Sequence, residues 1–290
     1  MSKKQVFVVK GSSPWYRFDW WDVFKITNID KSVSGQVTVT CKDVTNTCSM
    51  FEDCYDLISL DVSNFDTSKV KDMTEMFYNC NKLTSLDVSN FDTSNVENMA
   101  AMFSDCYNLA SLDVSSFDTS KVYIMAAMFD RCYSLTKLDL SNFDTSSVGD
   151  MSLMFDNCYR LNTLNVSNFD TSYVRDMWGM FYGCKSLTTL DLSSFNTSKV
   201  DNMCDMFENC SGLTTLDLSN FDTSNVELMN SMFSNCTNLK TIKGVIDMKS
   251  CKNCYDMFKN CINLRNVKIK NPPDDFIESG LLELQYTVVS

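Results

Sequence analysis

The sequence contains no histidine, and glycine and proline are scarce, with eight and three among 290 residues. Without histidine, the commonest general base is missing, and Ser-His and Cys-His nucleophile pairs are excluded. The glycines form no phosphate-binding loop, and no apolar run reaches the ~18 residues of a membrane span. We therefore expect no enzymatic activity, no cofactor and no membrane span.

Positive charge is also in short supply, because 25 Lys and Arg face 37 Asp and Glu, for a net charge of −12. Lys69, Lys121 and Lys199 stand singly among carboxylates, so we expect no nucleic-acid partner. The start "MSKKQVFVVKG" has only a short apolar run, well below the ~7–15 residues of a signal-peptide core. No Sec signal is visible. Export by another route and action at the place of synthesis or assembly both stay open.

A ten-residue segment recurs throughout the chain with a period of 26 residues. "SLDVSNFDTS" or a close variant begins at Ser59, Ser85, Ser111, Lys137, Thr163, Thr189 and Thr215. "MF" followed three residues later by Cys recurs in the same register from Met50 to Met257, which marks nine coils. A period of this size is typical of a solenoid, in which each repeat packs mainly on its neighbours. We predict one array over residues 44–266.

Each coil has a strand pattern followed by a helix pattern. Leu83, Leu86 and Val88 alternate with Asp87 and Ser89, which predicts a half-buried strand. In the next "DTS", Ser94 is the predicted helix N-cap, with Glu97 completing a capping box. The apolar stripe of the predicted three-turn helix consists of Val96, Met99, Met102, Phe103 and Cys106. The pattern therefore predicts a right-handed α/β solenoid, with parallel strands on one face and short helices on the other.

The repeat "LxxLDLSNFDTSxVxxMxxMFxxC" resembles the 26-residue repeat of BspA-like leucine-rich-repeat surface proteins. The resemblance covers roughly residues 44–266. It implies a leucine-rich-repeat solenoid with a role in adhesion or protein binding and without catalysis. It supplies no defined set of binding residues, and this chain shows neither the export signal nor the wall anchor of a cell-surface member.

One repeated aspartate points away from the predicted core on successive strands. This series, which we call the Asp ladder, consists of Asp61, Asp87, Asp113, Asp139, Asp191 and Asp217, and Asn165 interrupts it. Because like charges ~5 Å apart repel, each carboxylate needs compensation. Two interpretations remain open: local hydrogen bonds from Ser, Thr or backbone N–H groups, and a stripe that binds cations or a basic partner. A second series, from Asp66 to Asp222, fits local Asx-type capping.

Tyrosines recur after the repeated cysteine in the first half of the chain only, at Tyr55, Tyr107, Tyr133 and Tyr159. They fit either half-buried packing or an interface, since tyrosine combines contact area with a polar tip. The repeat position that holds Lys71, Glu97 and Tyr123 carries a different residue type from coil to coil. This variation predicts that the position lies on a solvated face.

Nine of the 14 cysteines share one apolar repeat position, which predicts buried free thiols rather than disulfides. Cys251 and Cys254 have the spacing of a zinc or redox half-site, but both align with core positions, so we interpret them as core substitutions. We predict no metal site.

The two ends depart from the repeat. Residues 1–43 read as a β-rich cap or attachment segment, in which Trp15, Trp20 and Trp21 are candidate binding anchors. Residues 267–290 read as a C-terminal cap in which a last strand, "VKIK", is broken by Pro272 and Pro273.

The resulting hypothesis is a non-enzymatic recognition or adhesion module that binds a protein or a host-surface ligand. The alternative is a structural component of an assembly such as a phage virion, attached through residues 1–43. Both predict exposure on the surface of a cell or particle, and the second includes a cytoplasmic stage before assembly.

Overall fold

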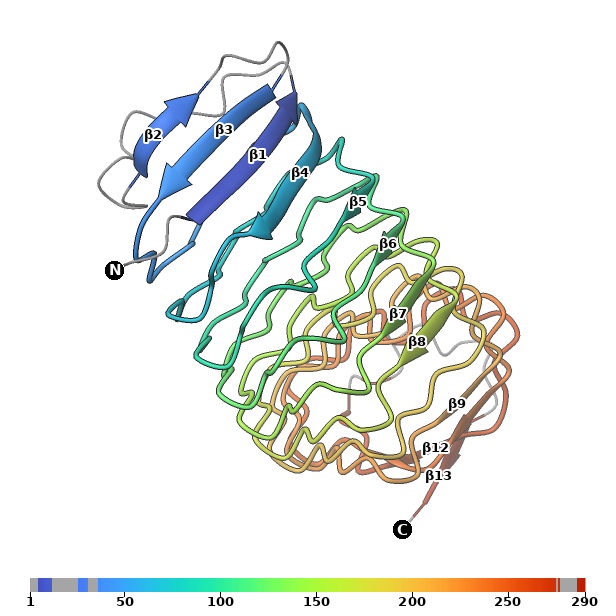
Figure 1. Ribbon diagram of the computed structural model, residues 1–290. Helices are drawn as coiled ribbons and strands as arrows, with labels where there is room; N and C mark the ends of the chain where they lie inside the picture. The colour runs from blue at the N-terminus through green and yellow to red at the C-terminus, as the bar shows by residue number, and fades with distance from the viewer. Residues whose placement is uncertain (1–4, 12–25, 31–35, 275, 277–285, 290) are drawn as a thin grey trace.

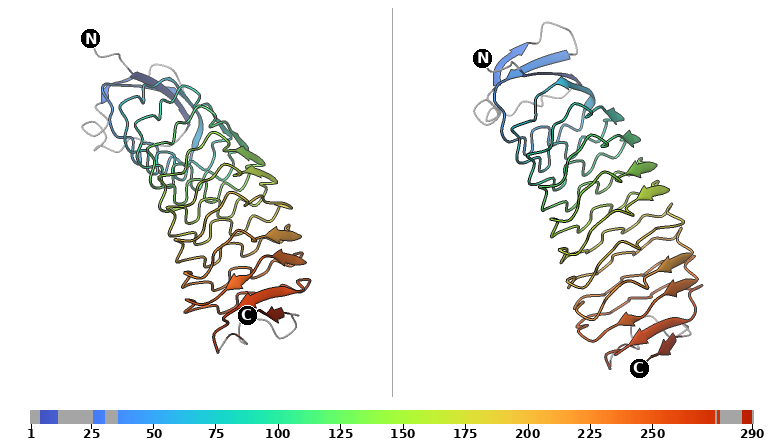
Figure 2. Two further views of the ribbon diagram at one scale, coloured as in Figure 1. Left: turned by 90° about the horizontal axis from the view of Figure 1, so that it is seen from below. Right: turned by 60° about the horizontal axis from the view of Figure 1, so that its bottom comes forward.

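The computed structural model describes residues 5–11, 26–30, 36–274, 276 and 286–289. The chain winds into an elongated solenoid whose coils stack along one axis, with a small antiparallel sheet at its N-terminal end (Figure 1). Figure 2 shows the coils side by side in two further views, with the chain termini at opposite ends of the molecule. The solenoid predicted from the 26-residue period is thus present.

The antiparallel sheet joins the N-terminal segment to the first coil. Its strands are β1 (Gln5–Gly11), β2 (Ile26–Asp30), β3 (Gln36–Cys41) and β4 (Leu57–Asn64), in the order β2-β3-β1-β4. The strand β4 is the long strand of the first coil, and it pairs with β1 in the register Val9↔Leu60. The backbone edge of this coil is therefore covered by β1. The proposed boundary at residue 43 stays a prediction, and Trp15, Trp20 and Trp21 lie outside the described residues.

Short parallel strands line one side of the solenoid (Figure 1). They are β5 (Ser85–Leu86), β6 (Ser111–Leu112), β7 (Lys137–Asp139), β8 (Thr163–Asn165), β9 (Thr215–Asp217) and β10 (Thr241–Lys243). Equivalent residues pair in register, as in Leu86↔Leu112 and Leu138↔Leu164. A second line of parallel bridges joins the coils elsewhere on their circumference, from Asp72↔Asn98 to Leu228↔Asn253. The predicted stacking of identical residues is confirmed.

The predicted helices are wrong, since the described residues contain no α-helix. Two residues in each coil have a left-handed backbone, and they lie four positions apart; Ala101 (φ 51°) and Asp105 (φ 58°) are one such pair. A right-handed helix cannot continue through such residues. The five residues of the predicted stripe, Val96, Met99, Met102, Phe103 and Cys106, are all buried, but a chain of tight turns and no helix brings them inward.

Hydrogen bonding in this turn segment explains its path. The N–H groups of Ala101, Phe103 and Asp105 donate to carbonyls of the next coil at 2.8–3.0 Å, whereas that of Met102 donates to Met99 O three residues back at 3.3 Å. A helix would satisfy each group four residues back along the chain. Neighbouring coils provide the partners instead, so the segment needs stacking in order to fold.

The predicted N-cap triplet has a different role. Asp92 Oδ1 accepts a hydrogen bond from the Ser94 N–H at 3.0 Å, which makes an Asx-type turn. Thr93 is buried, and its Oγ1 donates to Asp118 O of the next coil at 2.9 Å. The local Asx interpretation of the second aspartate series is confirmed, although these aspartates cap turns and no helix. Glu97 does not complete a capping box; its carboxylate forms an ion pair with Lys71 Nζ at 2.7 Å.

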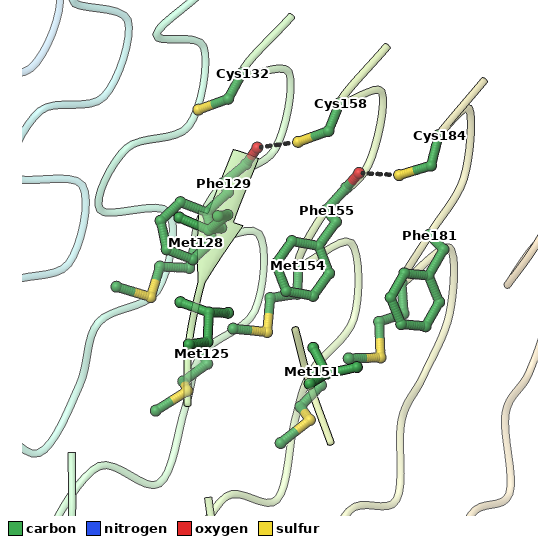
Figure 3. Close-up of a cluster of buried hydrophobic side chains, with 14 of the residues drawn as sticks. Met125, Met128, Phe129, Cys132, Met151, Met154, Phe155, Cys158, Phe181 and Cys184 are labelled. Atoms are coloured by element: carbon green, nitrogen blue, oxygen red, sulfur yellow. Dashed lines mark hydrogen bonds between the residues drawn. The ribbon is translucent and has the colours of Figure 1, made fainter. Parts of the chain in front are cut away.

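The core consists of continuous stacks of equivalent side chains. Phe51, Phe77, Phe103, Phe129, Phe155, Phe181, Phe207, Phe233 and Phe258 stack ring on ring with centroid separations of 5.4–5.9 Å. Figure 3 shows three of them beside buried methionines and cysteines. The Cys158 thiol donates to Phe129 O of the preceding coil at 3.2 Å. Each core residue is thus fixed by the coils on both sides.

The C-terminal end closes with the strands β11 (Ile246–Asp247), β12 (Val267–Lys270) and β13 (Tyr286–Val288), which form a parallel sheet. β12 is the strand expected at "VKIK", and it ends before Pro272. The extent of the C-terminal cap stays a prediction.

Candidate functional site

The Asp ladder lies on the strand side of the solenoid, and all six of its side chains are exposed. Each carboxylate accepts a hydrogen bond from the backbone N–H of the serine two residues later, at 2.9–3.1 Å. The serine hydroxyls, followed by these backbone N–H groups, hold the pKa of Asp87, Asp113 and Asp217 below the ordinary value. The local hydrogen-bond interpretation is therefore confirmed, and the bonds also fix the carboxylates in place.

At the C-terminal end of the Asp ladder, a lysine compensates the carboxylate charge. Lys243 Nζ lies 3.2 Å from Asp217 Oδ2, and Asn165 Nδ2 lies 3.5 Å from Asp139 Oδ1. Within the described ranges, no lysine or arginine forms an ion pair with Asp87 or Asp113, whose carboxylates accept hydrogen bonds from Ser89 and Ser115. The middle of this face therefore presents a row of ionised carboxylates to solvent.

Two hollows indent the strand side along the Asp ladder. One, of about 500 Å³, includes Asp113, Lys137 and Asp139 in its lining, and another, of about 310 Å³, includes Asp191 and Asp217. Among the described residues, no group of three or more acidic or cysteine side chains is arranged to hold a metal ion.

The tyrosines are brought together only in part. Tyr107, Tyr133 and Tyr159 form a stack with centroid separations of 4.8 and 4.9 Å, and Lys185 Nζ lies 4.5 Å from the Tyr159 ring centroid. All three rings are half-buried, and burial beside Asp105 raises the pKa of Tyr107 to about 12. Tyr55 is 51% exposed and is separated from the stack by Asn81. The half-buried packing expected of the strip is confirmed for these three.

All 14 cysteines lie in the described part of the chain, and none forms a disulfide. Burial raises the pKa of Cys106 and Cys210 to about 12, so these thiols stay protonated and unreactive. Cys254 is buried and Cys251 is half-buried. The reduced-core interpretation of the repeated cysteine is confirmed.

Sequence reasoning missed a hollow on the turn segments. It has a volume of about 310 Å³, and its lining includes Arg131, Asp156, Trp178, Tyr182 and Asp205. Burial, then the neighbouring Asp130, raises the pKa of Asp156 to about 8. Departures from the repeat could have marked this place, because tryptophan stands at this position in no other coil, where the residues are Thr, Ala, Ser, Cys, Asn or Tyr, and two glycines follow within five residues.

One family of repeat proteins matches most of the chain. The family is described as "Mycoplasma protein of unknown function, DUF285", and its model matches residues 21–112, 80–165 and 161–271. The chain belongs to this family. No curated protein matches this DUF285 chain.

Two solved structures are similar to this DUF285 chain. A leucine-rich repeat protein from Bacteroides ovatus ATCC 8483 is 16% identical, with 91% of each chain covered and a TM-score of 0.24. An internalin (inlF) from Listeria monocytogenes str. 4b F2365 is 13% identical, with 79% of this chain and 68% of that chain covered and a TM-score of 0.26. The stacked coils of this chain themselves show the solenoid fold.

Among the described residues of this DUF285 protein, no helix is long and apolar enough to cross a membrane. The family description assigns no activity.

Proposed function

We propose that this DUF285 solenoid is a non-enzymatic recognition module that binds a protein or a host-surface ligand carrying basic groups. The Asp ladder is the proposed contact surface. The observation that carries the proposal is a row of exposed, ionised carboxylates held in fixed positions on parallel strands. BspA-like surface proteins, which the repeat resembles, supply the analogy for a role in adhesion at a cell surface.

The geometry supports a binding surface in two ways. Strands in register place equivalent carboxylates about 4.8 Å apart, so a partner meets an evenly spaced array. The Ser N–H bonds lower the pKa of these groups, so the array keeps its charge in mildly acidic surroundings. Complementary charge speeds association and selects partners.

A second property follows from the exposure of the Asp ladder. Because exposed charges are screened over about 8 Å at physiological salt, binding through this face should weaken as ionic strength rises. Binding through the stacked tyrosines would depend much less on salt. The two candidate surfaces can therefore be distinguished.

The test uses purified extracellular-matrix proteins ordered by isoelectric point and presented to the immobilised chain. We expect the basic members to bind, and we expect the triple variant Asp87→Asn, Asp113→Asn, Asp139→Asn to lose at least about tenfold in affinity, or ~1.4 kcal/mol. Asparagine suits this position, because Asn165 Oδ1 already accepts the Ser167 N–H at 3.2 Å.

A matched control removes three charges elsewhere. Glu97→Gln, Asp201→Asn and Glu227→Gln change the variable, solvent-facing position and leave the Asp ladder intact. This control should bind as the parent does. Equal losses in both variants would show that only net charge matters, and the assignment of the Asp ladder would be wrong.

A further inference from the structure

Trp178 forms one wall of the hollow on the turn segments, and its ring is held in place. The indole Nε1–H donates to Asp205 Oδ2 of the next coil at 2.9 Å. Because 42% of the side chain stays exposed, this bond fixes the ring without burying it. Thr74, Ala126 and Ser152 occupy the same repeat position, so the stacking of coils does not require an aromatic side chain here. A rigid aromatic surface therefore faces solvent in this coil.

Two glycines of the same coil shape the floor of the hollow. Gly179 and Gly183 have left-handed backbones, with φ 57° and φ 66°. A Cβ at Gly179 would lie 2.7 Å from Leu153 Cδ2, and a Cβ at Gly183 would lie 2.5 Å from Asn157 Oδ1. Because both Cβ atoms are absent, the side chains of Leu153 and Asn157 from the preceding coil lie close over this backbone. In the sequence, no other coil has glycine at both positions, so this floor is particular to the coil of Trp178.

The lining combines this aromatic wall with polar groups of three kinds. Asn157 contributes a carboxamide, Asp205 a carboxylate and Arg131 a guanidinium, and each of the three side chains is at least partly exposed. A ligand hydroxyl can pair with all three, because it donates to their oxygen atoms and accepts from their N–H groups. A charged ligand group would instead face one group of its own sign. The polar part of the lining therefore favours a neutral ligand with several hydroxyls.

The aromatic wall adds a second requirement. The face of an indole ring carries negative electrostatic potential and attracts the positively polarised hydrogens of C–H groups. A pyranose has such C–H groups on the face of its ring and hydroxyls around its edge, so it meets both requirements. The hollow, at about 310 Å³, lies at the lower end of the ~300–1,000 Å³ of ligand pockets, which suits a single ring. We propose that this hollow binds one pyranose ring of a carbohydrate, which stacks on Trp178 and turns its hydroxyls toward Asn157 and Asp205.

This site is independent of the proposed function. It lies on the turn segments and shares no lining residue with the hollows of the Asp ladder. A free monosaccharide and the terminal residue of a glycan chain offer the same ring. The experiment separates these sources by comparing each methyl glycoside with a disaccharide that ends in the same sugar, such as lactose for galactose and cellobiose for glucose.

The test is saturation-transfer difference NMR on the full chain with methyl β-D-glucopyranoside, methyl β-D-galactopyranoside and methyl α-D-mannopyranoside. We expect at least one of them to bind saturably with a Kd of about 1–10 mM, because a single ring gains few contacts. Saturation should reach the C–H protons of one ring face most strongly. If the matching disaccharide binds at least as tightly, the source is a glycan chain; if only the single ring binds, it is a free sugar. The absence of saturable binding by all three glycosides would overturn the proposal.

The decisive variant is Trp178→Ala, which the fold accommodates because Ala126 holds the same repeat position. We expect it to weaken glycoside binding at least tenfold. Tyr173→Ala is the matched control, since it removes an aromatic side chain of the same coil that is 60% exposed and does not line the hollow. This control should bind as the parent does. Parent-like binding by Trp178→Ala, or equal losses in both variants, would show that the ring does not stack on Trp178.

Gly179→Ala tests the floor of the hollow while the aromatic wall stays in place. Ala101 and Ala127 hold the same repeat position with left-handed backbones, at φ 51° and φ 55°, so the fold tolerates alanine there. The added Cβ forces Leu153 away from the backbone and changes the shape of the hollow, so we expect glycoside binding to weaken at least threefold. Unchanged binding would contradict the placement of the ring over this floor. Saturable binding of N-acetyl-phenylalaninamide, with none of the glycosides, would assign the hollow to a peptide side chain and overturn the proposal.

Discussion

Single residues in this molecule are held to their places by the backbone conformation of the turns. The residue before each repeated cysteine has a left-handed backbone, and in most coils it is asparagine, aspartate or glycine. These residue types tolerate that conformation best. Arg131 is the exception at this position, with φ 53°, and its guanidinium pairs with neighbouring carboxylates instead. A local preference repeated in most coils therefore directs the chain away from a helix.

Glycine substitutions test this constraint. Gly244 has φ 98°, and a Cβ there would lie 2.6 Å from Leu218 O, whereas a Cβ at Gly149 would meet nothing within 4 Å. We expect Gly244→Ala to lower the free energy of unfolding by about 1–3 kcal/mol. Gly149→Ala should be neutral or slightly stabilising. Urea denaturation of both variants measures the difference, and equal stability would show that the Gly244 turn relaxes without cost.

The buried carboxyls predict an unusual dependence of stability on pH. The pKa values of Asp156 and Asp130 in the folded chain, about 8 and about 6, lie above the ordinary value of about 3.9. The folded state then binds more protons than the unfolded state above about pH 4, so stability falls as pH rises until these folded values are passed. Asp105, Arg131 and Ser104 face the pair and do not remove the effect.

The measurement is the urea midpoint between pH 5 and pH 8.5. We expect the midpoint to decline over this range in the parent and to decline less in Asp156→Asn. Asp191→Asn serves as control, because hydrogen bonds lower the pKa of this exposed residue and its titration falls below the range. A flat profile in the parent would show that the carboxyls of Asp130 and Asp156 are not shifted upward.

At the scale of the element, strands and turns differ in how much the sequence reveals. Alternation of Leu86 and Val88 with Asp87 predicted the strand and the exposure of the Asp ladder, because a strand has only two faces. The spacing of Val96, Met99 and Met102 predicted a helix, yet that spacing also suits a turn-rich path that points the same residues inward. The hydrogen-bond partners of the turn segment are backbone carbonyls of the next coil. The hydrophobic periodicity of a single repeat carries no information about these partners.

The same limit explains the hollow at Trp178. Repetition marks what stacking requires, whereas Trp178 and Gly179 each occur once at their repeat position, and aspartate occurs at the position of Asp156 only there and at Asp130. Their proximity depends on the offset between neighbouring coils, which brings residues about 26 positions apart together. Reading departures from the repeat as a group would have indicated this place, although not the burial of Asp156.

Phe143, which follows the strand β7 by four residues, gives a test of coil packing. Phe143 is 2% exposed, so Phe143→Ala should cost ~3–5 kcal/mol through lost burial and the cavity that remains. Tyr173→Ala, at a side chain that is 60% exposed, should cost far less. Chemical denaturation measures both. If Phe143→Ala has the same free energy of unfolding as the parent, the core can close around the cavity.

The whole molecule behaves as a stack in which each coil contacts mainly the coils beside it. Removal of one full period, residues 109–134, joins Asn108 to Leu135 in the correct repeat register. We expect a shorter solenoid with the same type of circular dichroism spectrum and a somewhat lower melting temperature. Removal of residues 109–121 alone breaks the register and should prevent folding. If both deletions fold equally well, register is not what holds the coils together.

The hydrogen bonds between coils, such as that from Phe103 N to Met128 O, give the molecule a defined response to force. A pull on the two termini loads successive coils in series, so the weakest coil yields first and its neighbours remain wound. Each yielding coil frees 26 residues, or roughly 90 Å of extended chain. A stretched molecule would therefore lengthen in steps of nearly constant size, dissipating work at each step, and would rewind when the load is released.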